Sequence, residues 1–353
     1  MIRIADRPVG QNIAPFIIAE MSGNHNQSLY RALEIVDAAA ESGVHALKLQ
    51  TYTADTITLN VKKEEFLIND KSSLWDGYNL YELYQRAHTP WEWHEDIFNR
   101  AKEHGMICFS SPFDETAVDF LEELNVPAYK IASFENIHLP LIHKVATTGK
   151  PIIISTGMAT IEEIDEAVST ARNAGCEDII LLKCTSAYPA TAENSNILTL
   201  NDLRERFTCE TGLSDHTLGI GAAIAAVAHG ACVIEKHFTL DRDDGGVDSV
   251  FSLDPSEMTQ LVSESERAWQ AMGQVSYGAT EQEKESLAFR RSLYIAEDIS
   301  IGDVLDENNL RCVRPGLGLA PKYLNQLLGL SVNTKLKKGT PMKWDYVDKS
   351  DRK

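Results

Sequence analysis

Short apolar runs alternate with amphipathic helical stretches from residue 16 to about residue 240. The eight runs, rich in β-branched residues and predicted to be strands, are Phe16–Glu20, His45–Thr51, Ile107–Pro112, Ala128–Ser133, Pro151–Gly157, Ile179–Ser186, Glu210–His216 and Cys232–Thr239. The predicted helices include Leu29–Ser42, Trp91–His104, Glu115–Leu124, Ile161–Ala174, Gly219–His229 and Pro255–Ala271. Eight such alternating units predict an α/β fold of the (β/α)8 TIM-barrel type. An open doubly wound sheet is less favoured, because no glycine-rich dinucleotide motif follows the first strand.

One loop breaks this alternation. Residues 52–90, between the second predicted strand and its helix, contain the large side chains Leu67, Trp75, Tyr78, Leu80, Tyr81 and Tyr84. Loops this long at the carboxyl rim of a barrel usually carry function, so we expect a functional segment there. A lid packed only for stability is the alternative.

The pattern changes after Gly273. The barrel domain is predicted to span residues 1–275, followed by a linker over 276–291 and a small β-rich domain over 292–353, with short strands expected at Ser292–Ala296, Ile299–Leu305 and Leu310–Val313. Ile299–Leu305 and Leu336–Met342 share an apolar-x-x-Gly-x-x-apolar outline, which predicts two pseudo-symmetric halves. Because about 60 residues make a marginal core, this domain is expected to lean on something larger.

Composition narrows the class of protein. The 353 residues include 33 basic and 52 acidic side chains, a formal charge of −19, and 43% of the residues are hydrophobic, which excludes a disordered or fibrous chain. Such an acidic chain repels phosphate backbones, so neither nucleic acid nor membrane is expected as a partner. No apolar run reaches the roughly 20 residues of a membrane helix, and the start of the chain does not resemble a secretory signal. Six scattered cysteines indicate reduced thiols and a cytoplasmic location.

Polar residues gather at the ends of the predicted strands. They are Glu20, Lys48, Gln50, Ser110, Ser111, Lys130, Ser133, Ser155, Thr156, Lys183, Thr185, Ser186, Ser214, Asp215, His216, Glu235 and His237. In a barrel these ends converge on the face that carries the active site. Lysines on three strands are hard to explain as packing, because a buried charge is costly without a partner. Lysines and hydroxyls together suit a small anion such as a phosphate ester with a carboxylate.

Three further features suggest chemistry. His216 and His237 end neighbouring strands and could hold a divalent metal with open positions for water and substrate; a hydrogen-bonded structural pair is the alternative. Glu20 could act as a general base or bind a substrate hydroxyl, and its alternative is a salt bridge to a pocket lysine. Asp248 lies in a rim loop that suits a hydroxyl-bearing substrate.

Ordered motifs along the chain resemble the sialic acid synthase family. They are Ala19–His25, Lys48–Thr51, Tyr129–Ser133, Ser155–Met158, Cys184–Pro189, Leu213–His216 and Glu235–Thr239, with Val313–Leu319 resembling the family's C-terminal antifreeze-like (SAF) domain. Within the family, the branch that makes pseudaminic acid is most similar, through Leu80–Tyr84, Thr89–His94, Gly245–Phe251 and Phe289–Tyr294. The resemblance covers essentially the whole chain.

The resemblance implies a metal-dependent transferase that condenses phosphoenolpyruvate with 2,4-diacetamido-2,4,6-trideoxy-L-altrose. The products would be pseudaminic acid and phosphate. Synthesis of N-acetylneuraminate or legionaminate by the same chemistry is the alternative. A Schiff-base aldolase is a more remote rival, since barrel lysines can form imines. A non-catalytic sugar- or ice-binding protein is disfavoured by the basic residues of the C-terminal domain.

The resemblance also implies site residues. Phosphoenolpyruvate contacts carry over to Lys48, Ser111, Lys130, Ser133, Ser155 and Ser214. A serine at position 186 departs from the asparagine common in sialic-forming bacterial enzymes, although its hydroxyl can still meet an anion. Metal ligands (for Mn²⁺, Mg²⁺ or Co²⁺) carry over to His216 and His237, and sugar contacts to Glu20, Gln50, Glu135, Tyr188 and Asp248. Arg314 would reach the sugar from a partner subunit, which implies a domain-swapped homodimer.

The catalytic roles follow as a hypothesis. The metal on His216 and His237 would polarise the sugar aldehyde, and the enol carbon of phosphoenolpyruvate would attack it. Glu20 would orient or deprotonate the water that then adds. Lys48, Lys130 and the serines would hold the departing phosphate.

Overall fold

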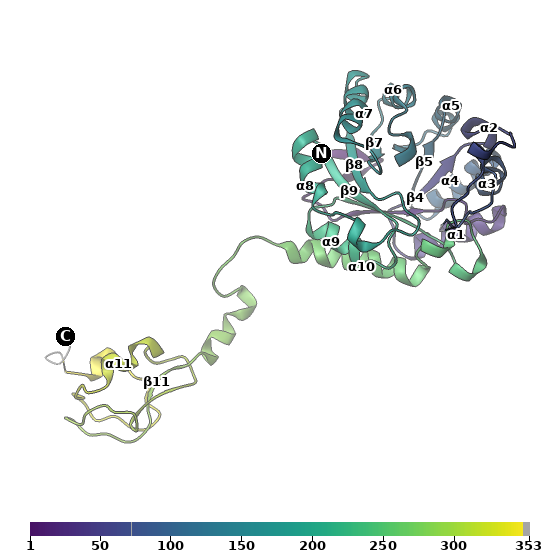
Figure 1. The fold of residues 1–353 in the computed structure, drawn as a ribbon. Helices are drawn as coiled ribbons and strands as arrows, with labels where there is room; N and C mark the ends of the chain where they lie inside the picture. Colours follow the sequence, from purple (N-terminus) through teal and green to yellow (C-terminus); the bar gives the residue numbers. More distant parts are fainter. Residues whose placement is uncertain (72, 349–353) are drawn as a thin grey trace. The chain divides into compact units, whose positions relative to one another are not determined.

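The computed structural model describes residues 1–71 and 73–348 (Figure 1). The chain divides into two compact units, Met1–Gly273 and Gln274–Lys353. Each unit has its own hydrophobic core. No helix within the described residues is long and apolar enough to cross a membrane.

The first unit is a closed barrel of eight parallel strands in the order β10-β3-β4-β5-β6-β7-β8-β9. The strands are β3 (Phe16–Glu20), β4 (Ala46–Thr51), β5 (Ile107–Pro112), β6 (Tyr129–Ile131), β7 (Ile152–Ser155), β8 (Ile179–Cys184), β9 (Glu210–Asp215) and β10 (Val233–His237). The prediction of a TIM barrel is confirmed, and each strand lies within its predicted run. The register pairs Glu20 with Lys48 and with His237, so the polar strand ends stand side by side.

Helices cover the outside of the barrel (Figure 1). They are α1 (Leu29–Glu41), α4 (His94–Glu103), α5 (Glu115–Glu123), α6 (Leu139–Ala146), α7 (Ile161–Asn173), α8 (Thr199–Phe207), α9 (Gly221–Ala228) and α10 (Pro255–Met272). Local sequence sets where they begin: the Asp114 carboxylate caps α5, and Thr160 with Glu163 forms a capping box on α7. All predicted helices are present. Helices α6 and α8 were not among them.

A hairpin that the sequence did not predict precedes the barrel. Strand β1 (Ile2–Ile4) pairs antiparallel with β2 (Arg7–Val9). Ile2, Ile4 and Val9 are buried in the same core cluster as Phe16 of β3. The N-terminus is therefore part of the barrel unit, although its sequence is mixed and polar.

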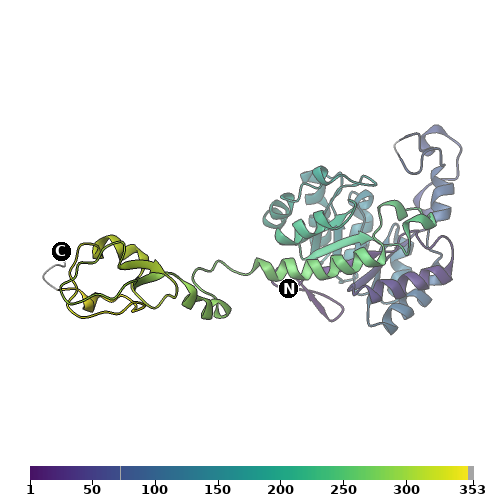
Figure 2. The ribbon, with the colours of Figure 1, turned by 90° about the horizontal axis from the view of Figure 1, so that it is seen from below.

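The inserted segment 52–90 has a loose structure of its own. It contains α2 (Ala54–Ile57), the 3-10 turn η1 (Glu64–Phe66) and α3 (Leu80–Ala87), and it leads into the turn η2 (Trp91–Trp93). Within it Tyr52 and Leu83 are buried, whereas Leu67 and Leu74 are exposed. In Figure 2 the middle of this segment stands out from the edge of the barrel. Its aromatic side chains Trp75, Tyr78, Tyr81 and Tyr84 are half-buried.

The second unit is a small β-rich fold. Strands β11 (Ser292–Ile295) and β12 (Leu310–Val313) pair antiparallel, and they are accompanied by α11 (Leu324–Leu327) and the 3-10 turns η7 (Glu281–Glu283), η8 (Glu285–Phe289), η9 (Pro321–Tyr323) and η10 (Trp344–Tyr346). The prediction of a strand over Ile299–Leu305 is wrong. A turn at Gly302, whose φ is +87°, interrupts it and leaves isolated bridges at its ends. The two Gly-centred segments do meet, because Ile299 and Leu336 exchange both backbone hydrogen bonds (2.9 and 3.0 Å).

Candidate active site

A buried charge cluster lies at the carboxyl ends of β3, β4, β6 and β10. Lys48 forms an ion pair with Glu20, and its Nζ lies 3.9 Å from Glu235 Oε1. Lys130 Nζ lies at the same distance from that oxygen. The Gln50 amide donates to Glu20 Oε1 at 2.8 Å. Two lysines and two glutamates thus neutralise one another in the barrel interior.

Glu235 is the centre of this cluster, and sequence reasoning did not select it as a site residue. Its Oε1 accepts a hydrogen bond from Ser214 Oγ at 3.1 Å, and its Oε2 is buried without a hydrogen-bond partner. Burial alone would raise the pKa of this carboxyl, but Lys130 and Lys48 lower it. The sequence did contain a clue to this role: Glu235 and His237 are two positions apart on one strand, so their side chains lie on the same face.

The protonation of Glu20 differs from that of Glu235. Burial raises the pKa of Glu20 to about 7, against the opposing effect of Lys48. Burial alone would lower the pKa of Lys48, but the carboxylates of Glu20 and Glu235 raise it, so its ammonium stays charged. The salt bridge between Glu20 and a pocket lysine, the alternative reading of the sequence, is therefore present. A carboxyl that titrates near neutrality is also suited to proton transfer at physiological pH.

Serine hydroxyls converge beside the lysines. Lys48 Nζ donates to Ser111 Oγ at 3.3 Å, and Ser133 Oγ accepts from the Gly157 amide at 3.2 Å. A Cβ on Gly157 would lie 2.3 Å from Ser186 Oγ and 2.6 Å from Ser133 Oγ. Glycine at this position is therefore what allows the two hydroxyls to approach. Ser155 Oγ, at the end of β7, is buried and lacks a hydrogen-bond partner.

The two histidines face each other across the ends of β9 and β10. The ring centroids of His216 and His237 are 5.3 Å apart. His216 Nδ1 lies 3.0 Å from the carbonyl oxygen of Thr185. Because a carbonyl can only accept, Nδ1 carries a proton, and Nε2 has a free lone pair when the ring is neutral. His237 Nδ1 is buried without a hydrogen-bond partner, and burial lowers the pKa of this imidazole, which is therefore neutral.

An aromatic wall encloses the histidine pair. Tyr188 lies 4.6 Å from His216 between ring centroids, and Phe251 lies 4.9 Å from His237. Asp248 accepts a hydrogen bond from Ser22, and its Oδ2 lies 3.6 Å from His237 Nδ1. Residues predicted to contact the sugar thus border the imidazoles.

Two further residues, Glu135 and Arg314, were predicted to contact the sugar. Glu135 lies in η3 (Ser133–Glu135), where its Oε2 is buried and lacks a hydrogen-bond partner, and burial raises the pKa of its carboxyl to about 7. Arg314 is exposed on the second compact unit.

Two further buried polar groups near the site were not selected from the sequence. Cys184 Sγ lies 3.8 Å from Ser186 Oγ and 3.9 Å from His216 Nδ1. Burial would raise the pKa of this thiol, but His216 lowers it to about 7. Lys236 is buried on the other face of β10, where it donates to Asp215 Oδ2 at 2.9 Å. Lys183, by contrast, donates to the Cys184 carbonyl rather than joining the cluster.

Family models match both compact units. The NeuB family model matches residues 35–277, and the SAF domain model matches residues 290–348. The chain belongs to the NeuB family. Members of this family condense phosphoenolpyruvate with a sugar, a transferase-type reaction, so the chain is an enzyme of this class.

Individual relatives are similar over almost the whole chain. The pseudaminic acid synthase of Helicobacter pylori is 44% identical over 95% of this chain and 98% of its own length. A pseudaminic acid synthase of Campylobacter jejuni is 44% identical over 93% of this chain and 95% of its own length. Among solved structures, the N-acetylneuraminic acid synthetase of Leptospira borgpetersenii, in complex with citrate, superimposes with a TM-score of 0.72 at 30% identity and covers 81% of this chain and 94% of its own. The NeuB assignment thus rests on sequence and on fold.

Proposed function

We propose that this NeuB-family enzyme is a pseudaminic acid synthase. It condenses phosphoenolpyruvate with 2,4-diacetamido-2,4,6-trideoxy-L-altrose and releases phosphate. The observation that carries the chemistry is the buried pair of lysines, Lys48 and Lys130, set beside two imidazoles at one end of the barrel. The choice of sugar rests on the similarity to pseudaminic acid synthases.

Phosphoenolpyruvate is held by the lysines and the serine hydroxyls. Lys48 and Lys130 are buried, and both lie near Glu235. Because folding has already removed water from these two ammonium groups, a phosphate or carboxylate that binds them does not have to desolvate the lysines. The hydroxyls of Ser111, Ser133, Ser155, Ser186 and Ser214 supply neutral donors at the same strand ends. The unpartnered Ser155 Oγ supports a role in binding.

His216 and His237 are the proposed metal ligands, for Mn²⁺, Mg²⁺ or Co²⁺. The described residues hold no cluster of three or more metal-ligating side chains, so the protein would supply two nitrogens and leave several positions to substrate and water. Nε2 of a neutral His216 and His237 Nδ1, which is buried without a hydrogen-bond partner, fit this donor set. When bound, such an ion would act as a Lewis acid on the sugar aldehyde.

Side chains of the protein position the substrates and the water for the reaction. Binding both substrates at the strand ends places the enol carbon of phosphoenolpyruvate against the aldehyde carbon, which removes much of the entropic cost of their encounter. Gln50 holds Glu20 through a 2.8 Å hydrogen bond, so that Glu20 can orient the water or take its proton. The tetrahedral intermediate collapses and expels phosphate, which Lys48, Lys130 and the serines receive.

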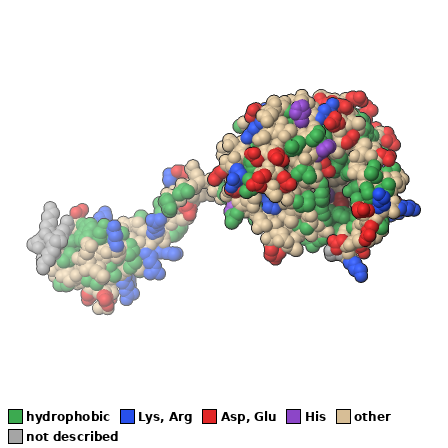
Figure 3. Space-filling view, turned by 45° about the horizontal axis from the view of Figure 1, so that its top comes forward, with side chains coloured by type: hydrophobic (Ala, Val, Ile, Leu, Met, Phe, Trp, Pro, Cys, Tyr) green, Lys and Arg blue, Asp and Glu red, His purple; other side chains and the backbone are tan. Residues whose placement is uncertain are grey.

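A second copy of the chain completes the site in this proposal. Residues 1–273 carry 20 basic and 41 acidic side chains, whereas residues 274–353 carry 13 and 11, so the second unit is attracted to an acidic barrel. Figure 3 shows the Lys and Arg side chains of the second unit on its surface. Both units also expose apolar side chains that a partner subunit could cover: Phe134 of η3 and Met158 on the first unit, and Phe289 and Leu317 on the second. Arg314 of a partner subunit would reach the sugar in a domain-swapped homodimer. A cytoplasmic location is proposed from the six free cysteines.

The test is phosphate release from phosphoenolpyruvate with Mn²⁺. Three sugars are compared, each with and without EDTA: the altrose sugar, N-acetylmannosamine and the precursor of legionaminate. We expect release with the altrose sugar alone, and its loss with EDTA. Preference for another sugar would overturn the substrate assignment and keep the mechanism. The absence of release from a folded dimer with every sugar would contradict the synthase proposal. In that case, borohydride trapping would test the aldolase.

A further inference from the structure

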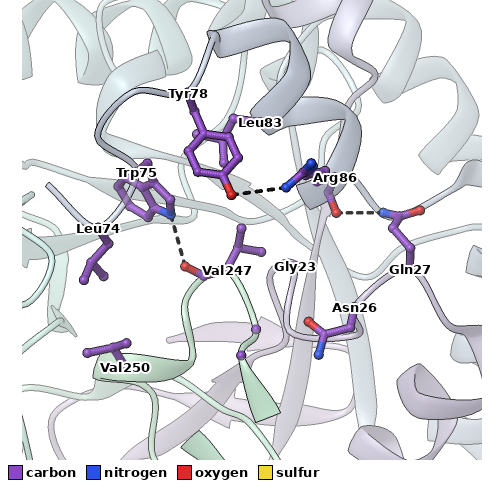
Figure 4. A pocket seen from close by; sticks show the side chains of 12 residues that line it. Gly23, Asn26, Gln27, Leu74, Trp75, Tyr78, Leu83, Arg86, Val247 and Val250 are labelled. Carbon is purple, nitrogen blue, oxygen red and sulfur yellow. Dashed lines mark hydrogen bonds between the residues drawn. The ribbon is translucent and has the colours of Figure 1, made fainter. Parts of the chain in front are cut away.

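The inserted segment touches the barrel rim through Trp75. Its indole Nε1 donates a hydrogen bond to the Val247 carbonyl at 3.1 Å (Figure 4). Val247 directly precedes Asp248, the rim carboxylate that accepts from Ser22 and lies beside His237. The position of the loop that carries Asp248 is thus coupled to the inserted segment.

The ring of Trp75 makes a second contact with the site. Its centroid lies 5.8 Å from that of Tyr188, at an interplanar angle of 56°. Tyr188 in turn packs against His216 at 4.6 Å and against Phe251 at 5.3 Å. One side chain of the segment therefore contacts both the aromatic wall and the loop of Asp248.

The surroundings of Trp75 are open rather than tightly packed. A cavity of about 410 Å³ lies between the inserted segment and the rim, lined by residues that include Gly23, Leu74, Tyr78 and Val250 (Figure 4). The cavity leaves part of the indole without packing neighbours, so the hydrogen bond to Val247 is a main contact of this side chain with the rim. Loss of that bond would loosen the contact between segment and rim without removing a side chain from the barrel core.

We propose that Trp75 is a positioning residue for the sugar. This inference rests on the proposed function. By holding the Asp248 loop and Tyr188 in one arrangement, Trp75 sets the geometry in which the sugar is held and distinguished from other acetamido sugars. The contacts of Trp75 are with Val247 and Tyr188, whereas phosphoenolpyruvate is proposed to bind at Lys48 and Lys130, so we expect the loss of Trp75 to act mainly on the sugar.

The test compares Trp75→Phe with Trp269→Phe. Trp75→Phe retains a ring against Tyr188 and removes the donor to Val247. Trp269→Phe is the matched control, because its indole also donates to a backbone carbonyl, that of Gln11, but from α10. Steady-state kinetics of phosphate release are measured for both substrates, with the altrose sugar and with N-acetylmannosamine. Thermal unfolding is followed for each variant.

We expect Trp75→Phe to raise the KM for the altrose sugar roughly three- to tenfold, as for the loss of one hydrogen bond, and to leave the KM for phosphoenolpyruvate unchanged. The preference for the altrose sugar should fall by a similar factor. Trp269→Phe should alter neither KM. Unchanged sugar kinetics in Trp75→Phe, or an equal rise in both KM values, would overturn the inference. If the unmodified enzyme released no phosphate with any sugar, the proposed function would fail first, and this inference with it.

Discussion

Glu135 shows how single residues in this site are held at a cost to stability. Burial raises the pKa of its carboxyl from 4.5 to about 7, mainly by penalising the ionised form. Its Oε2 is buried without a hydrogen-bond partner. A carboxyl group placed this way is poorly solvated until a substrate polar group reaches it. The unsatisfied oxygen supports the proposed role of Glu135 in binding the sugar.

Glu135→Gln should therefore stabilise the protein above neutral pH. With a raised pKa, the folded state binds a proton more tightly than the unfolded state, so stability falls as the pH rises from about 4.5 through about 7. The glutamine amide cannot ionise, so the variant does not lose this stability. At pH 8 its free energy of unfolding should exceed that of the unmodified protein by about 1–3 kcal/mol. Urea unfolding at pH 5 and pH 8 measures it, with Glu205→Gln on the surface as control. An equal effect of the substitution at both pH values would contradict the account.

Strand alternation is a local property, so it could be used on the sequence alone to place polar side chains on a common strand face. Lys48 and Gln50, two positions apart on β4, were placed on one face, and the structure shows both of them bonded to Glu20. The importance of Glu235 was not predicted. It follows from the meeting of β4, β6 and β10, in which one carboxylate lies between two lysines. A contact of this kind depends on register between distant strands.

Strands β9 and β10 are fastened to each other by a buried ion pair. Lys236 Nζ donates to Asp215 Oδ2 and to the carbonyl of Gly219, and both charged side chains are almost fully buried. Each of these residues is adjacent in sequence to one of the two imidazoles, His216 or His237. The pair thus fixes the register of the two elements that carry the proposed metal ligands.

Lys236→Met should destabilise the barrel by about 3–5 kcal/mol, because it leaves the Asp215 carboxylate buried and unpaired. The double variant with Asp215→Asn should recover a large part of this loss. The surface pair Lys144–Asp119 provides the control, and Lys144→Met should cost less than about 1 kcal/mol. Chemical denaturation measures all three. A small effect of Lys236→Met, comparable to that of the control, would show that the ion pair does not hold the strands.

Strands and helices were predicted correctly where the apolar residues follow a single clear pattern. The eight barrel strands are continuous apolar runs bounded by polar residues, and all eight were predicted. Helix α6 has a proline at its second position and apolar residues at most others, which obscures a helical face. The β1–β2 hairpin is too short for a pattern to emerge. Gly302 divides the predicted strand Ile299–Leu305, because its positive φ makes a turn.

At the scale of the whole molecule, two inactive variants should complement each other if the site is shared between subunits. Glu20→Gln removes the proposed base from the barrel, and Arg314→Ala removes the proposed sugar contact from the second unit. In a domain-swapped hybrid, the intact barrel of one subunit receives the intact Arg314 of the other. Random mixing after dissociation should restore about a quarter of the normal activity. Activity that stays at the level of the separate variants, with hybrid dimers verified by mass, would show that Arg314 does not act on the partner's site.

The most direct test of the central claim follows the bridging oxygen of phosphoenolpyruvate. The chemistry proposed for Lys48, Lys130 and Glu20 places water on carbon, and phosphate then leaves with the bridging oxygen. With ¹⁸O at that position, the altrose sugar and Mn²⁺, the account predicts that the released phosphate carries the label and that one nine-carbon keto acid forms for each phosphate. Unlabelled phosphate with ¹⁸O retained in a keto acid would mean attack at phosphorus. That result would contradict the account.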